Sequence, residues 1–434
     1  MQRFPGLSPI LAAVFLAACS ESAAPPPSPA QALTYHRDVA PLVQQKCGSC
    51  HVEGGIAPFP LQSYAEVFAM RGAVKAAVKA RIMPPWPADP ECTEYAADRS
   101  LSSEETDLLV RWVDEGGVEG EPSEAPASLP QSVQGELPRV DLKLTMPVEY
   151  SPSQTPDDYR CFILDWPETD VRYVTGFVAK PGRPSIVHHI IAFLARPEQV
   201  SQFQEMDAAE PGPGYTCFGG PGGDATRASW VGAWVPGREA TILPVGTGIQ
   251  IPVGSKIVLQ VHYNLSSANA VPDRTSLEMS LTSSVEKVAI VQPWADPEWV
   301  RQPESMLIPA GKKDVQHKFS FDVSSALSYM TGGVFQNNQP ITVYGAGLHM
   351  HTRGSWARMD IERRTGAKEC MLHVPRWDFH WQGSYGFAQP KVVKPGDRIA
   401  LECHWDNSQP GARDVEWGEG TEDEMCLGSF LMTQ

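Results

Sequence analysis

The chain has 434 residues, of which 42% are hydrophobic, and a formal net charge of −16. The acidic balance argues against nucleic acid as a partner, because nucleic-acid binding needs a basic face, and against a polybasic hold on anionic lipid. The length allows about three domains. The chain contains 36 glycines and 40 prolines and lacks a long heptad run, which indicates a β-rich protein with many turns.

Residues 1–18 have the features of an export signal. Arg3 precedes a short apolar run that ends in LAAC, whose last residue is Cys19. Such a run, closed by small residues, is typical of a signal peptide and is too short to span a membrane. The ending resembles a bacterial lipobox, which would make Cys19 a lipidated first residue and residues 19–33 a disordered tether; the alternative is a plain secretory signal with a chance cysteine. We expect a lipoprotein that faces the periplasm, with its lipid anchor in the outer membrane, because Ser20 does not resemble the aspartate of inner-membrane lipoproteins.

The segment CGSCH predicts one covalently bound haem c. It comprises Cys47, Cys50 and His51. In a C-x-x-C-H motif both thiols form thioethers with the haem and the histidine reaches the iron. A zinc site would need a second Cys/His pair nearby, and none follows. A redox dithiol would have no use for the histidine.

The residues around this motif, 34–118, favour a small all-α domain that resembles a class I cytochrome c. TYHRDVAPLVQQKC predicts a short helix before the motif, and LSSEETDLLVRWVDEGG predicts another with a serine cap and a glycine stop. Met83 in RIMPPWP is the expected sixth iron ligand, because the prolines hold its loop extended and a thioether raises the haem potential. His36 is the alternative ligand. A further alternative is that Met83 only packs in the core and does not bind the iron. Residues 119–140, rich in Pro, Ser and Glu, are expected to form a linker.

Two histidine pairs lie in apolar segments that we expect to be β-strands. His188 and His189 are adjacent in IVHHIIAF, and because neighbours on a strand point to opposite faces, both cannot be core residues of one face. His349 and His351 are two apart in ITVYGAGLHMHTRG and therefore share a face. A further strand, KIVLQVHYNL, carries His262. A lone buried histidine is more often a core residue than a ligand, but two pairs favour metal binding.

The rest of the chain, from residue 141 to 434, resembles the copper type II ascorbate-dependent monooxygenases of the peptidylglycine and dopamine hydroxylase kind. The similar motifs keep the family's order and are VHHII, WVPGREATILPVGTGIQIPVGSKIVLQVHYN, LIPAG, HMH and CHWDN with WGEGTEDEMC. The resemblance implies two all-β jelly-roll domains, residues 141–282 and 283–434, each of which holds one copper ion. The predicted fold is thus multidomain, with the small cytochrome c domain followed by two jelly rolls.

The resemblance also implies the ligands of the two copper ions. The first copper, which transfers electrons, would be held by His188, His189 and His262, and the second, where oxygen and substrate react, by His349, His351 and Met425. Imidazole suits copper in both oxidation states, while a thioether favours Cu(I). We expect one histidine of the adjacent pair to bind through its near ring nitrogen and the other through its far one, with a local distortion of the strand.

The oxidising compartment permits disulfides. Those implied by the resemblance join Cys161 to Cys217 and Cys403 to Cys426, and the second would pin the loop that carries Met425. Cys92 and Cys370 remain. They are either free or tie the haem domain to the second jelly roll.

These features predict a copper monooxygenase that inserts one oxygen atom from O2 into a C–H bond of an unknown small molecule. Electrons would come from ascorbate or a periplasmic redox protein and pass through the fused haem. The alternative is a non-catalytic electron-transfer or copper-handling lipoprotein. In the peptide-amidating branch an arginine, an asparagine and a tyrosine help to hold the peptide carboxylate, whereas this chain has Gly347, Leu427 and Ser429 there. Arg353 could substitute for the arginine, but glycine-extended peptides are not the expected substrate.

Overall fold

The fold is taken from a computed structural model of the chain. The structure describes residues 1, 32–53, 57–125, 136–217, 220–222, 229–235, 240–265, 269–379, 381–418, 420 and 422–434. The expected signal peptide after Met1, the lipidation site Cys19 and most of the tether lie outside the described residues, as do residues 126–135 of the expected linker. No helix within the described ranges is long and apolar enough to cross a membrane.

The described residues from 32 to 125 are built from helices. In chain order these are η1 (Tyr35–Val39), α1 (Ala40–Lys46), α2 (Tyr64–Lys79), α3 (Ser103–Asp114) and η2 (Pro122–Glu124). Ser102 caps α3 by accepting a hydrogen bond from the Glu105 N–H, and Gly116 follows the helix with a positive φ, so the predicted start and stop of this helix are confirmed. Leu109 and Trp112 are buried in an apolar cluster of this segment's own.

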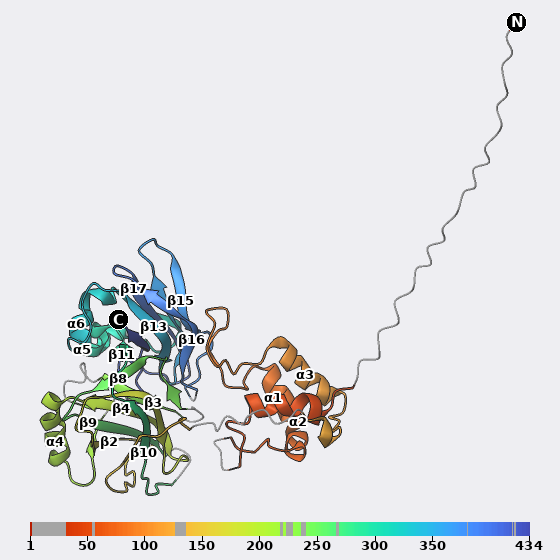
Figure 1. Cartoon of the computed structure of the whole chain (residues 1–434), viewed down its shortest axis with the longest axis horizontal. Coiled ribbons are helices and arrows are strands. Elements are labelled where there is room, and N and C mark those ends of the chain that lie inside the picture. Colours follow the sequence, from red (N-terminus) through yellow and green to blue (C-terminus); the bar gives the residue numbers. More distant parts are fainter. Residues whose placement is uncertain are drawn as a thin grey trace.

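The chain beyond residue 136 is mostly β-sheet (Figure 1). Its strands are β1 (Leu142–Thr145), β2 (Asp157–Asp165), β3 (Arg172–Lys180), β4 (Val187–Ala195), β5 (Tyr215–Thr216), β6 (Ser229–Trp234), β7 (Thr241–Ile242), β8 (Thr247–Ile251), β9 (Lys256–Asn264), β10 (Ser276–Thr282), β11 (Lys287–Trp294), β12 (Lys312–Phe321), β13 (Ile341–His349), β14 (Gly354–Glu362), β15 (Lys368–Val374), β16 (Ser384–Val393), β17 (Arg398–Asn407) and β18 (Leu427–Thr433). Short helices between them are η3 (Pro197–Gln199), α4 (Val200–Ala209), α5 (Pro297–Arg301), η5 (Pro303–Met306), η6 (Val323–Ala326) and α6 (Leu327–Met330).

The strands form a 14-stranded sheet and a 4-stranded sheet. The larger one follows the order β1-β10-β3-β8-β11-β6-β4-β9-β2-β5. Strands β18, β13 and β16 join it through β11, and β7 joins it through β3. The smaller one has the order β12-β17-β14-β15. Strand β11 pairs with β6 and β8 of the first half and with β18 of the second. Because of this sharing, the halves on either side of residue 282 meet in one continuous sheet, although each has its own apolar core.

The loop between α2 and α3 docks the helical segment onto the second half of the β-region, where Figure 1 shows it reaching β16. Ala96 N–H donates to the Gly386 carbonyl at 2.8 Å, and Ala388 N–H donates to the Glu94 carbonyl at 2.9 Å. The cysteines that the sequence left unassigned, Cys92 and Cys370, form a disulfide beside these bonds. The helical segment is thus tied covalently to β15.

We expect the double variant Cys92→Ser/Cys370→Ser to lower the free energy of unfolding by about 2–5 kcal/mol, the usual cost of losing a native disulfide. The bond closes a loop with a sequence separation of 278 residues. Amide hydrogen exchange at Ala96 and Ala388 should accelerate, because their hydrogen bonds then hold the interface without the covalent link.

The matched control is Cys161→Ser/Cys217→Ser, which removes a disulfide that joins β2 to the residue just after β5, within the first half. It should also reduce stability but leave the two interface amides protected. Equal exchange of these amides in wild type and in the Cys92/Cys370 variant would contradict the docking role.

Candidate metal centres

A β-bulge turns the adjacent histidines of β4 toward a single point. In the pairing of β4 with β9, His189 lies opposite His262 and Val187 lies opposite Tyr263, so His188 is the extra residue of the bulge. A bulge places one unpaired residue in a strand and redirects its side chain. The local strand distortion that the sequence analysis required is therefore present.

The three imidazoles of this cluster converge through their near ring nitrogens. The Nδ1 atoms of His188 and His189 are 3.4 Å apart, and those of His189 and His262 are 3.3 Å apart. The expectation of one near and one far nitrogen was wrong, because the bulge brings both near nitrogens of the adjacent pair to the same face. Among the described residues, these three form the one group of three or more His, Cys, Asp and Glu side chains whose ligand atoms lie close enough, within 4.8 Å of one another, to hold a metal ion.

The far nitrogen of His262 is occupied by the protein. His262 Nε2 donates to Asp157 Oδ1 at 2.9 Å, and the Asn264 amide donates to the same oxygen at 2.8 Å. Tyr159 stacks on the His262 ring at 4.0 Å between centroids. The hydrogen bond to Asp157 fixes the tautomer of His262, so its lone pair lies on Nδ1 and faces the cluster.

Two of these imidazoles have lowered pKa values, which favours their neutral form. Desolvation and the neighbouring rings of His262 and His188 lower the pKa of His189 well below its ordinary value. Desolvation also lowers the pKa of His262, although Asp157 acts in the opposite direction. A set of three imidazoles whose near nitrogens converge fits a copper ion, for which imidazole is a suitable ligand.

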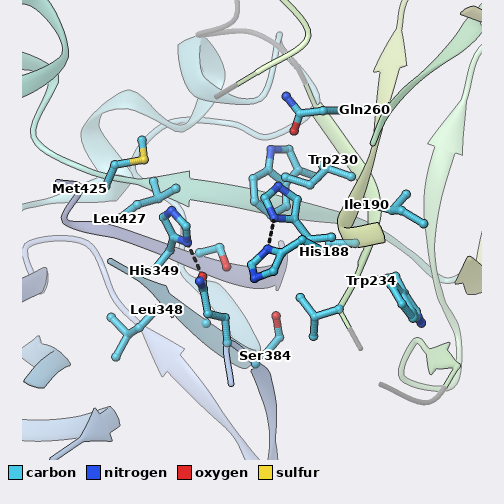
Figure 2. Close-up of a pocket in the computed structure, with 18 of the residues that line it drawn as sticks. His188, Ile190, Trp230, Trp234, Gln260, Leu348, His349, Ser384, Met425 and Leu427 are labelled. Atoms are coloured by element: carbon cyan, nitrogen blue, oxygen red, sulfur yellow. Dashed lines mark hydrogen bonds between the residues drawn. The ribbon is translucent and has the colours of Figure 1, made fainter. Parts of the chain in front are cut away.

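The second cluster forms where β13 ends beside the start of β18. His349, the last residue of β13, pairs with Leu427, the first of β18, which brings Met425 to the same end of the sheet. His351 follows two residues after His349, and their ring centroids lie 5.1 Å apart. Figure 2 shows Met425 and Leu427 close to His349. Cys426 is bound to Cys403, which fixes the residue next to Met425.

Both histidines of this second cluster use Nδ1 for the protein. His349 Nδ1 donates to Gln382 Oε1, and His351 Nδ1 donates to the Asp423 carbonyl at 2.9 Å. Burial lowers the pKa of His349 to about 3 and that of His351 to about 4. Two neutral imidazoles with Nε2 available, together with a thioether, make a donor set that fits copper and favours its reduced state.

A buried carboxyl group, Glu424, supports this cluster and was missed by the sequence analysis. It accepts hydrogen bonds from the backbone N–H groups of His351 and Arg353 and from the Trp405 indole. Burial raises its pKa to about 7. The side chain of Arg353 is bound to Asn407 and Glu422 and does not line the cavity described next, so it does not substitute for the missing arginine.

The two clusters face each other across one cavity of about 130 Å³, lined by the histidines of both except His262, and by Met425. Figure 2 shows His349, Leu427 and Met425 on one side and His188, Trp230 and Trp234 on the other. The rest of the lining is mainly apolar, with Gln260, Gln382, Ser384 and Ser429 among its polar members. The geometry therefore gives two unlike metal sites access to one small, largely apolar space.

A second cavity, of about 1050 Å³, surrounds the C-x-x-C-H motif and is lined by Cys47, Cys50, His51 and Met83. His51 Nδ1 donates to the Phe59 carbonyl at 2.9 Å, which directs the other ring nitrogen toward a ligand. These donors and this apolar volume fit a covalently bound haem.

His36, the alternative axial ligand, does not line this second cavity and lies 3.6 Å from Glu119 instead. The position of Met83 in the wall favours it over His36 as the residue that would face the iron. The wall also includes residues 182–187, Trp381 and His188. His188 consequently borders both cavities.

Comparisons with known proteins give matches to copper monooxygenases. Residues 301–432 match the family model described as the copper type II ascorbate-dependent monooxygenase C-terminal domain. The chain is 23% identical over 256 residues to DBH-like monooxygenase protein 1 of Gallus gallus and 24% identical over 293 residues to DBH-like monooxygenase protein 2 of Mus musculus. These matches support a copper type II ascorbate-dependent monooxygenase family. Together with the disulfides, they also suggest a secreted or exported protein.

The similarity to these monooxygenases is partial. The alignments cover 57% and 61% of this chain but only 39% and 44% of the relatives, so the chain spans less than half the length of the curated relatives it matches. Among solved structures, the VP2 subviral particle of infectious bursal disease virus matches at 13% identity, over 72% of this chain and 75% of that chain, with a TM-score of 0.17. A similarity at that level supports no conclusion about the fold.

We expect Asp157→Ala to weaken copper binding at the first cluster by about 10- to 100-fold, the usual cost of losing a residue that orients a metal-binding histidine. Asp157 fixes His262 alone, so the second cluster should keep its affinity. Gln382→Ala is the matched control, because it removes the hydrogen-bond partner of His349. It should weaken copper binding at the second cluster and leave the affinity of the first unchanged. Chelator competition followed by EPR of each Cu(II) signal measures both effects, and equal losses at both clusters would contradict the assignment.

Proposed function

We propose that the chain is a copper-dependent monooxygenase that hydroxylates a C–H bond of a small molecule with O2. The observation that carries this proposal is the pair of unlike donor sets, three imidazoles and two imidazoles with a thioether, on one shared cavity. Copper, when bound, would supply stored electrons at the first cluster and oxygen activation at the second. We also propose that residues 141–282 and 283–434 each form a jelly roll.

The chain's own residues contribute position and exclusion of water. Asp157, Gln382 and the Asp423 carbonyl hold the imidazoles in fixed tautomers before any metal arrives. The apolar wall with Trp230 and Trp234 would take a hydrocarbon part of the substrate and keep water from the reacting atoms. A non-catalytic copper carrier would have no use for this lined space.

We further propose that residues 34–118 are a cytochrome c domain that delivers electrons to the first copper. Cys47 and Cys50 would attach the haem, with His51 and Met83 on its iron. The supporting observation is that His188, a member of the first cluster, forms part of the wall of the cavity around the C-x-x-C-H motif. The external donor would be ascorbate or a periplasmic redox protein, and Cys19 would carry the lipid that holds the chain at the outer membrane.

The central test is Met425→Ala. The variant should fold, keep copper at the first cluster and lose substrate-dependent oxygen uptake, because Met425 lies only at the second cluster. Oxygen consumption with a reductant and a panel of small candidate substrates measures the effect, with copper content and EPR as controls. Wild-type turnover by this variant would refute the assigned ligand.

Glycine-extended peptides should not be hydroxylated by the purified protein. The three positions that correspond to the carboxylate-holding residues of the amidating branch, Gly347, Leu427 and Ser429, all line the shared cavity, and none carries a positive charge. An unpaired carboxylate in such a space would be strongly disfavoured. Mass spectrometry for a peptide that has gained one oxygen atom, and for its amidated breakdown product, is the measurement, and efficient formation of either would overturn the prediction.

In the anaerobic, haem-reduced and copper-oxidised protein, we expect the haem to become oxidised at a rate that does not depend on protein concentration. The haem, when attached at Cys47 and Cys50, would supply one electron, and the copper held at the first cluster would accept it. Stopped-flow absorbance follows the haem, and His188→Ala should abolish the phase because it removes a ligand that borders both cavities. A haem that stays reduced beside loaded, oxidised copper would refute the relay.

A further inference from the structure

One loop of the second half touches both metal clusters. It runs from β15 to β16, and its described residues are 375–379 and 381–383. The ring of Phe379 stacks on His188 of the first cluster, with centroids 5.2 Å apart and an angle of 19° between planes. The same ring meets His351 of the second cluster edge to face at 6.1 Å and 86°. A single aromatic ring therefore separates one imidazole of each cluster.

The loop is fixed to the second cluster on both sides of Phe379. The Trp377 indole donates to the His351 carbonyl at 3.0 Å, and Trp377 N–H donates to the Ser355 carbonyl at 2.8 Å. The Gln382 amide donates to the Phe379 carbonyl at 2.9 Å, while its oxygen accepts from His349. Phe379 is thus carried by the second half, and its contact with His188 bridges to the first half.

The start of the loop is anchored to the helical segment as well. β15, which leads into it, carries Cys370 of the disulfide with Cys92 and His373, whose Nδ1 lies 2.8 Å from Asp89 Oδ2. Trp381, near the other end of the loop, lines the cavity of the C-x-x-C-H motif. The loop therefore contacts all three places through which electrons would pass.

We propose that Phe379 is the positioning residue that couples the two copper centres. It holds the clusters at one separation and provides the contact route for the electron between them. This inference rests on the proposed function. In the step it serves, one electron leaves Cu(I) at the first centre and reduces Cu(II) at the second, with no transfer of atoms; the electron is replaced by the ferrous haem or by ascorbate. Filling the gap with a π-system matters because electronic coupling falls steeply across empty or water-filled space.

The test compares Phe379→Leu, which keeps apolar volume without a ring, with Phe379→Tyr, which keeps the ring. Pulsed dipolar EPR of the doubly Cu(II)-loaded holoprotein should give one narrow distance in wild type and in Phe379→Tyr. The distribution should broaden in Phe379→Leu, because the stacking on His188 is lost. An unchanged distribution in Phe379→Leu would overturn the holding role.

Freeze-quench EPR after anaerobic reduction through the haem gives the second readout. The first-centre Cu(II) signal should decay equally in all variants. The second-centre signal should decay roughly ten- to a hundredfold more slowly in Phe379→Leu, the scale of loss that follows when reacting groups are misplaced. Equal decay in Phe379→Leu and wild type would overturn the electron route.

The copper content of the wild type separates the two proposals. A wild-type protein that binds no copper at either cluster would overturn the proposed function and, with it, the coupling role of Phe379. A wild type that binds two coppers and hydroxylates a substrate, while Phe379→Leu matches it in both EPR readouts, would overturn the coupling role of Phe379 alone.

Discussion

The candidate metal centres depend on one constraint, which is that a buried histidine that is to bind a metal ion must be neutral and must have its second nitrogen occupied. An unsatisfied imidazole N–H inside the protein would cost free energy, and a charged one would repel its neighbours and the ion. Asp157 meets this need for His262, Gln382 for His349, and a backbone carbonyl for each of His351 and His51. The surrounding fold holds these acceptors in place.

The sheet supplies the required rigidity. The first cluster lies where β4 and β9 pair. The second lies where β13 and β18 pair, with His349 on β13, His351 two residues beyond it and Met425 two residues before β18, so paired strands in fixed register position both sets. Strand β11 pairs with strands of both halves, so the hydrogen bonds of one sheet fix the position of the halves relative to each other. Rigid placement of this kind favours pre-formed sites over sites that assemble around the metal.

The sequence predicted those parts of the sites that local patterns encode. Cys47, Cys50 and His51 form a compact motif, and helix α3 begins and ends at residues with a capping role. The nitrogen used by His188 could not be predicted, because it depends on a bulge that only the pairing with β9 reveals. Asp157 lies 105 residues from His262, and no local pattern links them. Phe379 was also missed, since it contacts His188 on β4 and His351 just beyond β13, which no local pattern connects.

The Cys92–Cys370 bond sets an order of assembly. A chain that leaves the cytoplasm N-terminus first presents Cys47, Cys50 and Cys92 to oxidising enzymes while Cys370, 278 residues beyond Cys92, is still inside the cell. Premature pairing among the early thiols would remove the attachment points for haem. Maturation would therefore need reduced thiols at the motif until the haem arrives, and the last disulfide would close only after the β-region has folded. Under the proposed function, joining haem and copper in one polypeptide would make cytochrome maturation and oxidative folding interdependent.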